Sequence, residues 1–489
     1  MKHPFKYFVG IMFLGLAFLL NACGQQELGE LEGQYVARIA ITAQDSVADI
    51  ETKYKASVSL WQPDLGFALL VFSDSAAIDT LGRKQVEPNE DTFYAPFRMS
   101  GSNVTTWASG GAAWGGGGAA WGGGGAAWGG GSTAWGGGVG YTGSLPPQQQ
   151  NAAIWDKLDL GEAYDLAQTW GAGITVAVID TGIDTYHPAF SKHLSPSSTW
   201  YDFVDNDTFP QEVAGGAGYG HGTAVAGIIV QVAPDVKIMP LRVLDPNGYG
   251  DTDDIVSAIY HAINQRVDII NLSLGGSISS SLLTTAINDA YAKGIMVLVS
   301  TGNEGYSNDL LFPAKLAKED SSTPNRTANV IAVGSINLND ELSLFSNYMP
   351  KLDAANNSGA ARFFSYGENI YTVYPDNRAI YATGTSFATP VVTGAVALVC
   401  VTAQELTAVS LGYMLCGPNA NGVASSSGTA SLTYHYMDMA SVNYVIGRSS
   451  NDLRTLIGSL SDPSTIKGKI NIKDAITAVL NLGAPISSK

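Results

Sequence analysis

Three polar side chains, far apart in the chain, have the types that nucleophilic catalysis uses. Asp180 ends the apolar run of "VIDTGID", His221 stands in "GHGTAVAG", and Ser386 stands in "GTSFATP". A serine hydroxyl becomes a good nucleophile when a neighbouring imidazole takes its proton and a carboxylate holds that imidazole in the required tautomer. Each residue alone is more typical of a structural role, such as a helix cap or a buried histidine. Together, they are the three residue types that a catalytic triad uses.

The segments around these residues predict an α/β fold with an open, mostly parallel sheet and helices on both faces. Predicted strands are apolar and rich in β-branched residues, and amphipathic segments lie between them. The strands are expected at 174–180, 237–243, 267–275, 295–302 and 329–336, and the helices at 155–171, 253–266 and 281–294. In such sheets, reactive groups gather where strands end and helices begin. Asp180 is expected at a strand end, and His221 and Ser386 at helix starts.

The three motifs, in the order Asp, His, Ser, resemble those of the subtilisin-like serine proteases, the subtilases. The resemblance covers residues 154–400 and resumes at 443–480. It implies that Ser386 attacks the scissile carbonyl, His221 moves the proton and Asp180 orients the imidazole. It also implies that Asn303, in "VLVSTGNEG", donates its side-chain amide to the oxyanion. Ser386 at a helix start directs backbone N–H groups toward the same charge.

The resemblance also implies a substrate-binding groove. "SLGG" and "NGYG" are similar to the two extended segments between which subtilases hold a peptide as an added antiparallel strand. Glycine in these segments lets the substrate backbone approach closely. A leucine that precedes "FPA" is expected to fill part of the primary pocket and to disfavour large substrate side chains. The predicted substrate-binding residues are Ser273, Leu274, Gly275, Gly248, Tyr249, Gly250 and Leu311.

The composition excludes one class of partner. The chain carries 26 Lys and Arg residues against 43 Asp and Glu residues, for a formal charge of −17. Neutralising phosphates needs clustered basic side chains, so nucleic-acid binding is not expected. The expected partners are protein or peptide substrates, and the expected state is a monomer.

The first residues predict export. Lys2 and Lys6 precede an apolar run at 8–20 that is short for a membrane span and typical of a signal peptide. "LNAC" then resembles a bacterial lipobox, which implies lipidation of Cys23 and a lipid anchor as the chain's membrane contact. Ordinary secretion and an uncleaved anchor are the alternatives. The expected location is extracellular or in the cell envelope.

Four segments are predicted along the chain. They are a signal peptide with the lipobox at 1–23, a propeptide-like α+β domain at 24–100, a Gly/Trp repeat linker at 101–150, and a subtilisin-like catalytic domain at 151–489 with an insertion at 401–440. The α+β domain is expected to have a strand, a helix, a strand and a helix. Its position is that of the subtilase prosegment, commonly a ferredoxin-like unit, so the resemblance implies an intramolecular inhibitor.

The linker places a tryptophan at every seventh residue in glycine, from Trp107 to Trp135. So much glycine excludes a stable helix, and an odd spacing would point successive rings to opposite faces of a strand. The default interpretation is a flexible connector, and the alternative is that the rings dock on a neighbouring domain. As a connector, it predicts a maturation cut between Gly136 and Ile154, or a stalk if the chain stays lipidated and uncut.

The sequence indicates no cofactor and no metal site. Ala189 stands where many bacterial subtilisins have an aspartate calcium ligand, and no loop interrupts the histidine helix, so the family's tight calcium site is expected to be absent. Weaker calcium sites elsewhere stay open. Two cysteines remain besides Cys23: Cys400 and Cys416 either pair in an oxidising compartment or Cys400 is a buried thiol.

The function predicted from these features is an exported serine endopeptidase, made as a proenzyme, that forms an acyl-enzyme intermediate. A narrower alternative is a dedicated protease that processes one precursor. An alternative from another class is a non-catalytic surface binding protein on a protease scaffold. All four catalytic residue types are present, which favours an enzyme.

Overall fold

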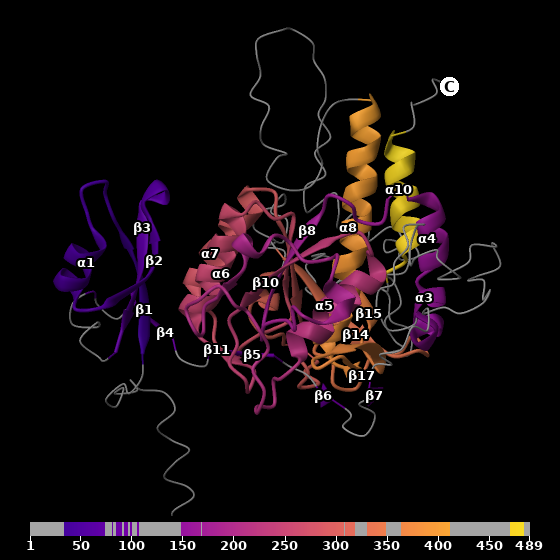
Figure 1. Cartoon of the computed structure of the whole chain (residues 1–489), viewed down its shortest axis with the longest axis horizontal. Helices are drawn as coiled ribbons and strands as arrows, with labels where there is room; N and C mark the ends of the chain where they lie inside the picture. The colour runs from indigo at the N-terminus through magenta and orange to yellow at the C-terminus, as the bar shows by residue number, and fades with distance from the viewer. Residues whose placement is uncertain are drawn as a thin grey trace, which may run out of the picture.

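A computed structural model of the chain (Figure 1) describes residues 34–73, 81, 85–89, 92–95, 98–99, 105–106, 148–167, 169–307, 309–317, 330–348, 363–410 and 470–483. Its largest element is a seven-stranded sheet in which every pairing is parallel. In spatial order the strands are β15 (Phe363–Tyr366), β14 (Ile331–Ile336), β13 (Met296–Ser300), β12 (Ile269–Leu272), β8 (Thr175–Asp180), β10 (Lys237–Arg242) and β9 (Tyr201–Asp202). The predicted α/β fold with a mostly parallel sheet is confirmed.

Helices cover both faces of this sheet, because alternate side chains of each strand point to opposite faces. Val176 and Val178 of β8 belong to one apolar core, and Ala177 and Ile179 belong to the other. Figure 1 shows one group of helices on one side of the sheet and a second group on the opposite side. The first group is α6 (Thr252–Asn264) and α7 (Ser281–Ala292); the second is α3 (Ala152–Lys157), α4 (Leu160–Leu166), α5 (His221–Val232), α8 (Thr385–Ser410) and α10 (Ile472–Gly483).

The strand order creates a switch point between β8 and β12. After β8 the chain passes through the edge strand β9 and α5 to β10 on one side, and the connection after β12 runs through α7 to β13 on the other. In open α/β sheets, a crevice forms outside the carboxyl ends of two such strands. Asp180 is the last residue of β8, and Ser273 follows the last residue of β12. Two of the predicted site residues therefore lie at this switch point.

An N-terminal segment forms a second, antiparallel sheet. Its order is β2 (Ser57–Gln62), β3 (Phe67–Phe72), β1 (Tyr35–Ala40) and β4 (Glu87–Pro88), with α1 (Val47–Tyr54) packed on it. The predicted strands at β1 and β3 and the helix at α1 are present. Strand β2 was missed, because its side chains are exposed or half-buried and give no clear apolar face. Most of the second predicted helix lies outside the described residues.

This N-terminal sheet contacts helices α6 and α7, which pack on the seven-stranded sheet. Phe67 of β3 packs on Tyr260 of α6 with ring centroids 4.9 Å apart. Glu87 of β4 accepts hydrogen bonds at the start of α7, from the hydroxyl of Ser280 at 2.6 Å and the backbone N–H of Ser281 at 2.8 Å. Asn89 accepts the backbone N–H groups of Thr252 and Asp253 at the start of α6. The unit thus satisfies N–H groups that a helix start leaves without intrahelical partners.

Three short strands that follow this sheet in the chain pair with strands β11 and β17. Strand β5 (Phe93–Tyr94) pairs with β11 (Tyr249–Gly250), and β6 (Arg98–Met99) and β7 (Thr105–Thr106) both pair with β17 (Arg378–Thr383). β17 also forms a hairpin with β16 (Ile370–Tyr374). The remaining elements are the 3-10 turns Pro63–Leu65, Gln148–Asn151, Pro188–Phe190, Ser197–Thr199 and Ala314–Ala317.

Several sequence expectations need adjustment. The segment 155–171 does not form one helix, since Asp159 adopts a positive φ of 51° between α3 and α4. Helix α8 continues past Cys400 to Ser410, into the segment expected to be an insertion. Cys400 is disulfide-bonded, which excludes a free thiol, and its partner lies outside the described residues. The linker repeat, most of the insertion and Cys23 also lie outside them.

One stretch among the described residues is long and apolar enough to cross a membrane, Thr385–Thr402 of α8. Its residues are all buried within the fold, as in the core helix of a globular domain. It packs against α5, α10 and four strands of the sheet.

A buried carboxylate before β12 makes the fold sensitive to pH. Asp268 accepts the backbone N–H of Thr175 at 2.8 Å, and burial raises its pKa to about 6. The folded state therefore binds a proton more tightly than the unfolded state, and stability falls as pH rises from about 4 to about 6. We expect Asp268→Asn to raise the free energy of unfolding at pH 8 by about 1 to 3 kcal/mol and to change it little at pH 3.5. Denaturant titration in a Ser386→Ala background measures this, and an equal gain at both pH values would contradict it.

Candidate active site

Asp180 and His221 form a buried polar pair. His221 Nδ1 lies 2.6 Å from Asp180 Oδ1, and both side chains are almost fully shielded from solvent. The same carboxylate oxygen accepts the backbone N–H of Thr181 at 2.7 Å. A carboxylate at Nδ1 favours the tautomer that leaves Nε2 able to accept a proton. The pair therefore has the arrangement of an oriented general base.

Two glycines let α5 approach β8 this closely. Gly220 precedes His221 with a φ of +88°, a conformation that favours glycine, and starts the helix at the site. Gly222 lies against the strand end: a Cβ there would come 2.1 Å from the carbonyl oxygen of Gly182 and 3.0 Å from Cβ of Asp180. The "HGT" turn thus fits only without a side chain at 222.

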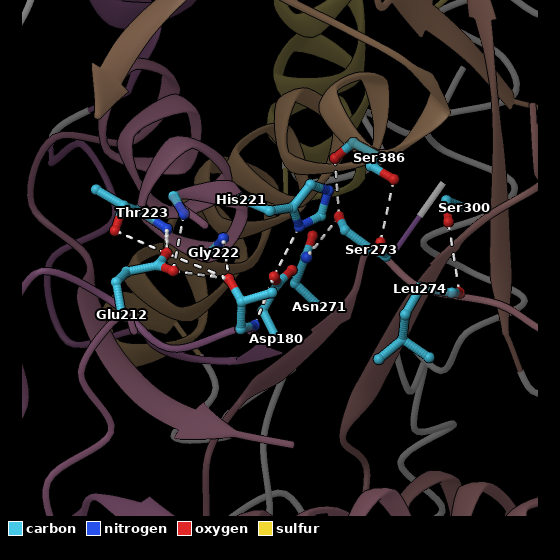
Figure 2. A network of polar contacts seen from close by, with 12 residues as sticks. Asp180, Glu212, His221, Gly222, Thr223, Asn271, Ser273, Leu274, Ser300 and Ser386 are labelled. Carbon is cyan, nitrogen blue, oxygen red and sulfur yellow. Dashed lines mark hydrogen bonds and ion pairs between the residues drawn. The ribbon is translucent and has the colours of Figure 1, made fainter. Parts of the chain in front are cut away.

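Ser386 lies in the first turn of α8 and is joined to the end of β12. Its hydroxyl donates to the carbonyl oxygen of Ser273 at 3.1 Å, and the Ser273 hydroxyl donates to the carbonyl oxygen of Ser386 at 2.8 Å. Asn271 extends this network by donating to Ser273 Oγ at 3.0 Å. Figure 2 shows the His221 ring between Asp180 and Ser386. The structure thus brings all three predicted triad residues into one site.

Asn303 lies beside the start of α8. Its side-chain oxygen accepts both the backbone N–H and the hydroxyl of Thr385, each at 2.9 Å. Thr385 is the residue before Ser386, so these bonds fix the orientation of the Asn303 amide next to the serine. The oxyanion role expected of the Asn303 amide stays a prediction.

The predicted substrate-binding segments lie on either side of β5. On one edge, Tyr94 and Gly275 exchange two backbone hydrogen bonds, each 2.9 Å long. On the other edge, Ala95 donates to the carbonyl oxygen of Gly248 at 3.0 Å, Phe93 pairs with Gly250 and Tyr94 pairs with Tyr249. A strand of the chain's own N-terminal segment thus lies between the two segments.

Side chains of β5 also fit this groove. Phe93 is buried, with its ring centroid 6.3 Å from that of Phe312. Tyr94 donates its hydroxyl to Glu304 at 2.6 Å, and burial together with this bond raises the Tyr94 pKa. Leu311 is buried beside Gly275, where a Cβ on the glycine would come 2.8 Å from Cβ of Leu311. Sequence reasoning missed Phe93 and Tyr94, because two paired residues are too few for a strand pattern. It also missed Glu304, whose contact with Tyr94 joins residues far apart in the chain.

The two features from which the sequence predicts that the family's tight calcium site is absent lie among the described residues. Ala189 is buried, and α5 runs from His221 to Val232 without an interrupting loop. Among the described residues, no group of three or more His, Cys, Asp or Glu side chains could hold a metal ion. Calcium binding and the absence of a cofactor stay predictions.

Comparison with known proteins agrees with this geometry. The model of the subtilase family matches residues 171–419. Thermitase of Thermoactinomyces vulgaris is 34% identical over 255 residues, which are 50% of this chain and 79% of thermitase. The major intracellular serine protease of Bacillus subtilis (strain 168) is 34% identical over 273 residues, 52% of this chain and 79% of that protein. The minor extracellular protease Vpr of the same strain is 36% identical over 174 residues, 33% of this chain and 21% of that protein.

The fold, together with these relatives, defines a serine-type endopeptidase. The chain belongs to the subtilase family, whose model covers about half of its length. The resemblance inferred from the three motifs is therefore confirmed at the level of family and class of enzyme.

The packing at Gly222 gives a test of the site. We expect Gly222→Ala to lower kcat/KM on the order of 100-fold, because the added methyl would push α5 from β8 and separate His221 from Asp180. Gly161→Ala in α4 is the matched control, since a Cβ there meets no atom within 4 Å. Peptide hydrolysis by both variants measures the effect, and equal activities would contradict the argument.

Proposed function

We propose that the chain is an exported serine endopeptidase, made as a proenzyme, that cleaves peptide bonds through Asp180, His221 and Ser386. One observation carries this proposal: the buried Asp180–His221 pair lies beside Ser386 at the carboxyl end of the sheet. The family membership supports the same reaction class.

In the proposed reaction, the Ser386 hydroxyl turns from the Ser273 carbonyl toward His221. Nε2 of His221 takes its proton as Oγ attacks the substrate carbonyl, and the imidazolium that forms is stabilised by Asp180. The same proton then passes to the leaving amine, which gives an acyl-enzyme. Water repeats the sequence and releases the acid. The 2.6 Å contact at Nδ1 supports the role assigned to Asp180.

Oxyanion stabilisation is proposed for Asn303 and the start of α8. The bonds from Thr385 fix the orientation of the Asn303 side chain beside Ser386, and its amide is proposed to donate to the developing charge. Backbone N–H groups in the first turn of α8 add a favourable dipole.

We expect Asn303→Ala to lower kcat about 100- to 1000-fold with little change in KM, because the lost hydrogen bond forms mainly in the transition state. Steady-state hydrolysis of a peptide substrate measures both constants. A variant whose KM rises while kcat is unchanged would assign Asn303 to substrate binding instead.

Substrates are proposed to bind as an added antiparallel strand between residues 248–250 and Gly275. The support is β5, which makes these backbone bonds within the chain itself. Backbone pairing would bind many sequences, and side-chain pockets would select among them. Phe93 is buried beside Phe312, and we propose that an apolar side chain of the substrate takes the place of Phe93.

The same strand supports proenzyme status. While β5 lies in the groove, an external peptide cannot pair with the same backbone groups. The N-terminal sheet holds β5 in place through its contacts with α6 and α7. Maturation would then need a cut that frees this unit, and the linker at 101–150 is proposed as its tether. Export, with lipidation at Cys23, completes the proposal on the strength of the first 23 residues.

The relatives do not choose between locations, since their names include both an intracellular and an extracellular protease. They also leave the substrate open, so the dedicated processing protease stays an alternative. The non-catalytic binding protein is the alternative from another class, and labelling separates it from an enzyme. A fluorophosphonate probe should label the matured wild type and not Ser386→Ala, because it reacts with an activated serine. Matured wild type that stays unlabelled would favour the binding protein.

Maturation gives a second measurement. We expect wild type to gain a new N terminus between Gly136 and Ile154, and Ser386→Ala to stay uncut, because the cut depends on the chain's own serine. N-terminal sequencing of both proteins decides this. A cut at 96–98, between β5 and β6, would keep the proenzyme but refute the linker as the cleavage site. An identical cut in both proteins would refute self-processing.

A further inference from the structure

Glu212 lies in the loop between β9 and α5, outside the three catalytic motifs. Its two carboxylate oxygens accept hydrogen bonds from three residues. Oε2 accepts the backbone N–H of Gly220 at 2.8 Å, and Oε1 accepts the backbone N–H and the hydroxyl of Thr223, both at 3.0 Å. The Thr181 hydroxyl contacts both oxygens, at 3.1 and 3.2 Å. Figure 2 shows this carboxylate facing the start of α5.

These three donors flank the catalytic pair in the chain. Thr181 follows Asp180, Gly220 precedes His221, and Thr223 lies in the first turn of α5. The Thr181 hydroxyl also accepts the backbone N–H of Gly222 at 2.9 Å, and the Thr223 hydroxyl accepts that of Asp184 at 2.9 Å. Each hydroxyl therefore accepts one N–H and donates its own proton to Glu212. The network joins the end of β8 to the start of α5 beside the Asp180–His221 contact.

The helix start explains why a carboxylate is suited to this place. Gly220 is the N-cap residue of α5 and has no side chain to accept the first N–H groups. Glu212 supplies that acceptor from a separate loop, and its negative charge is favourable at the positive end of the helix. Replacing the carboxylate by an amide would turn an NH₂ group toward an N–H or O–H donor.

We propose that Glu212 is a positioning residue of the protease: by fastening α5 to the end of β8, it sets the separation and orientation of Asp180 and His221. This inference rests on the proposed function for its effect on the reaction, but the geometry of the pair can be tested without activity. Glu212 contacts neither the predicted substrate segments nor Ser386. Its removal should lower kcat and leave KM nearly unchanged.

The ionisation of Glu212 gives a readout that a purely structural role would not. Burial raises its pKa to about 8, against the hydrogen bonds from Gly220 and Thr223, and the charge of Asp180 adds to the rise. Tyr219, before α5, and Tyr374 of β16 also interact with its charge. If Glu212 were protonated, its own O–H would point at N–H and O–H groups that already donate to it. The carboxylate is therefore the competent form, and kcat of the wild type should rise as pH passes through about 8.

The test compares Glu212→Gln with Glu341→Gln, a matched control at an exposed glutamate whose side chain accepts from Asn337. We expect Glu212→Gln to lower kcat about 10- to 100-fold with KM within twofold, and to lose the rise near pH 8. The control should match the wild type in kcat, KM and pH profile. A Glu212→Gln enzyme with the kcat and pH profile of the wild type would overturn the proposal.

Two further measurements keep the proposal testable if Glu212→Gln folds poorly or if the chain proves inactive. Thr181→Val removes one hydroxyl of the network and keeps the side-chain shape, and it should lower kcat in the same direction. In a Ser386→Ala background, NMR of the proton between His221 Nδ1 and Asp180 reports the pair directly. We expect Glu212→Gln to shift or broaden that resonance. A resonance that stays unchanged in both Glu212→Gln and Thr181→Val would refute the positioning role whatever the activity of the chain.

Discussion

The hydrogen bond between His221 Nδ1 and Asp180 Oδ1 is the interaction on which the site depends. Both groups are withdrawn from water, and a buried carboxylate is costly unless hydrogen bonds and a partner compensate it. The backbone N–H of Thr181 and the imidazole supply that compensation. Removing one partner would leave the other buried and unpaired, which typically costs about 3 to 5 kcal/mol. Catalytic geometry and stability are therefore coupled at this point.

The parallel sheet makes this contact possible between residues far apart in the chain. The carboxyl ends of β8 and β12 lie next to each other, and the first turns of α5 and α8 start above them. Ser273 and Asn271 fasten the end of β12 to the serine, as the Glu212 network fastens the end of β8 to the histidine. Asp180, His221 and Ser386 are thus held at strand ends and helix starts, both of which are rigid elements. Rigid supports of this kind keep reacting groups in place.

Much of this arrangement could be predicted from the sequence. Apolar β-branched runs identified five of the central strands, and the motif order placed Asp180, His221 and Ser386 at element ends. Glycines at 248, 250 and 275 marked a place where another backbone approaches, and β5 lies there. These signals are local, because strand periodicity and turn glycines need few neighbours to be recognised.

Other features depend on contacts that no local pattern contains. Strand β2 is only half-buried, and β5 has two residues whose partners follow more than 150 positions later. Glu212 is one glutamate in a polar loop, and its role appears only when β8 and α5 lie on either side of it. The sequence likewise left open whether Cys400 is a free thiol or forms a disulfide, and the structure shows the disulfide. Tertiary proximity decides all of these.

Strand β5 belongs to the same polypeptide as the edges that it pairs with. Two segments of one chain meet in an intramolecular step, and the effective concentration of such a step can exceed the concentration of a free competitor. A free peptide in the micromolar range would therefore compete poorly for residues 248–250 and Gly275. The pairing of β5 with these residues therefore depends on the intact chain between them. A single break in that connection would make the pairing bimolecular, and dilution could then release β5.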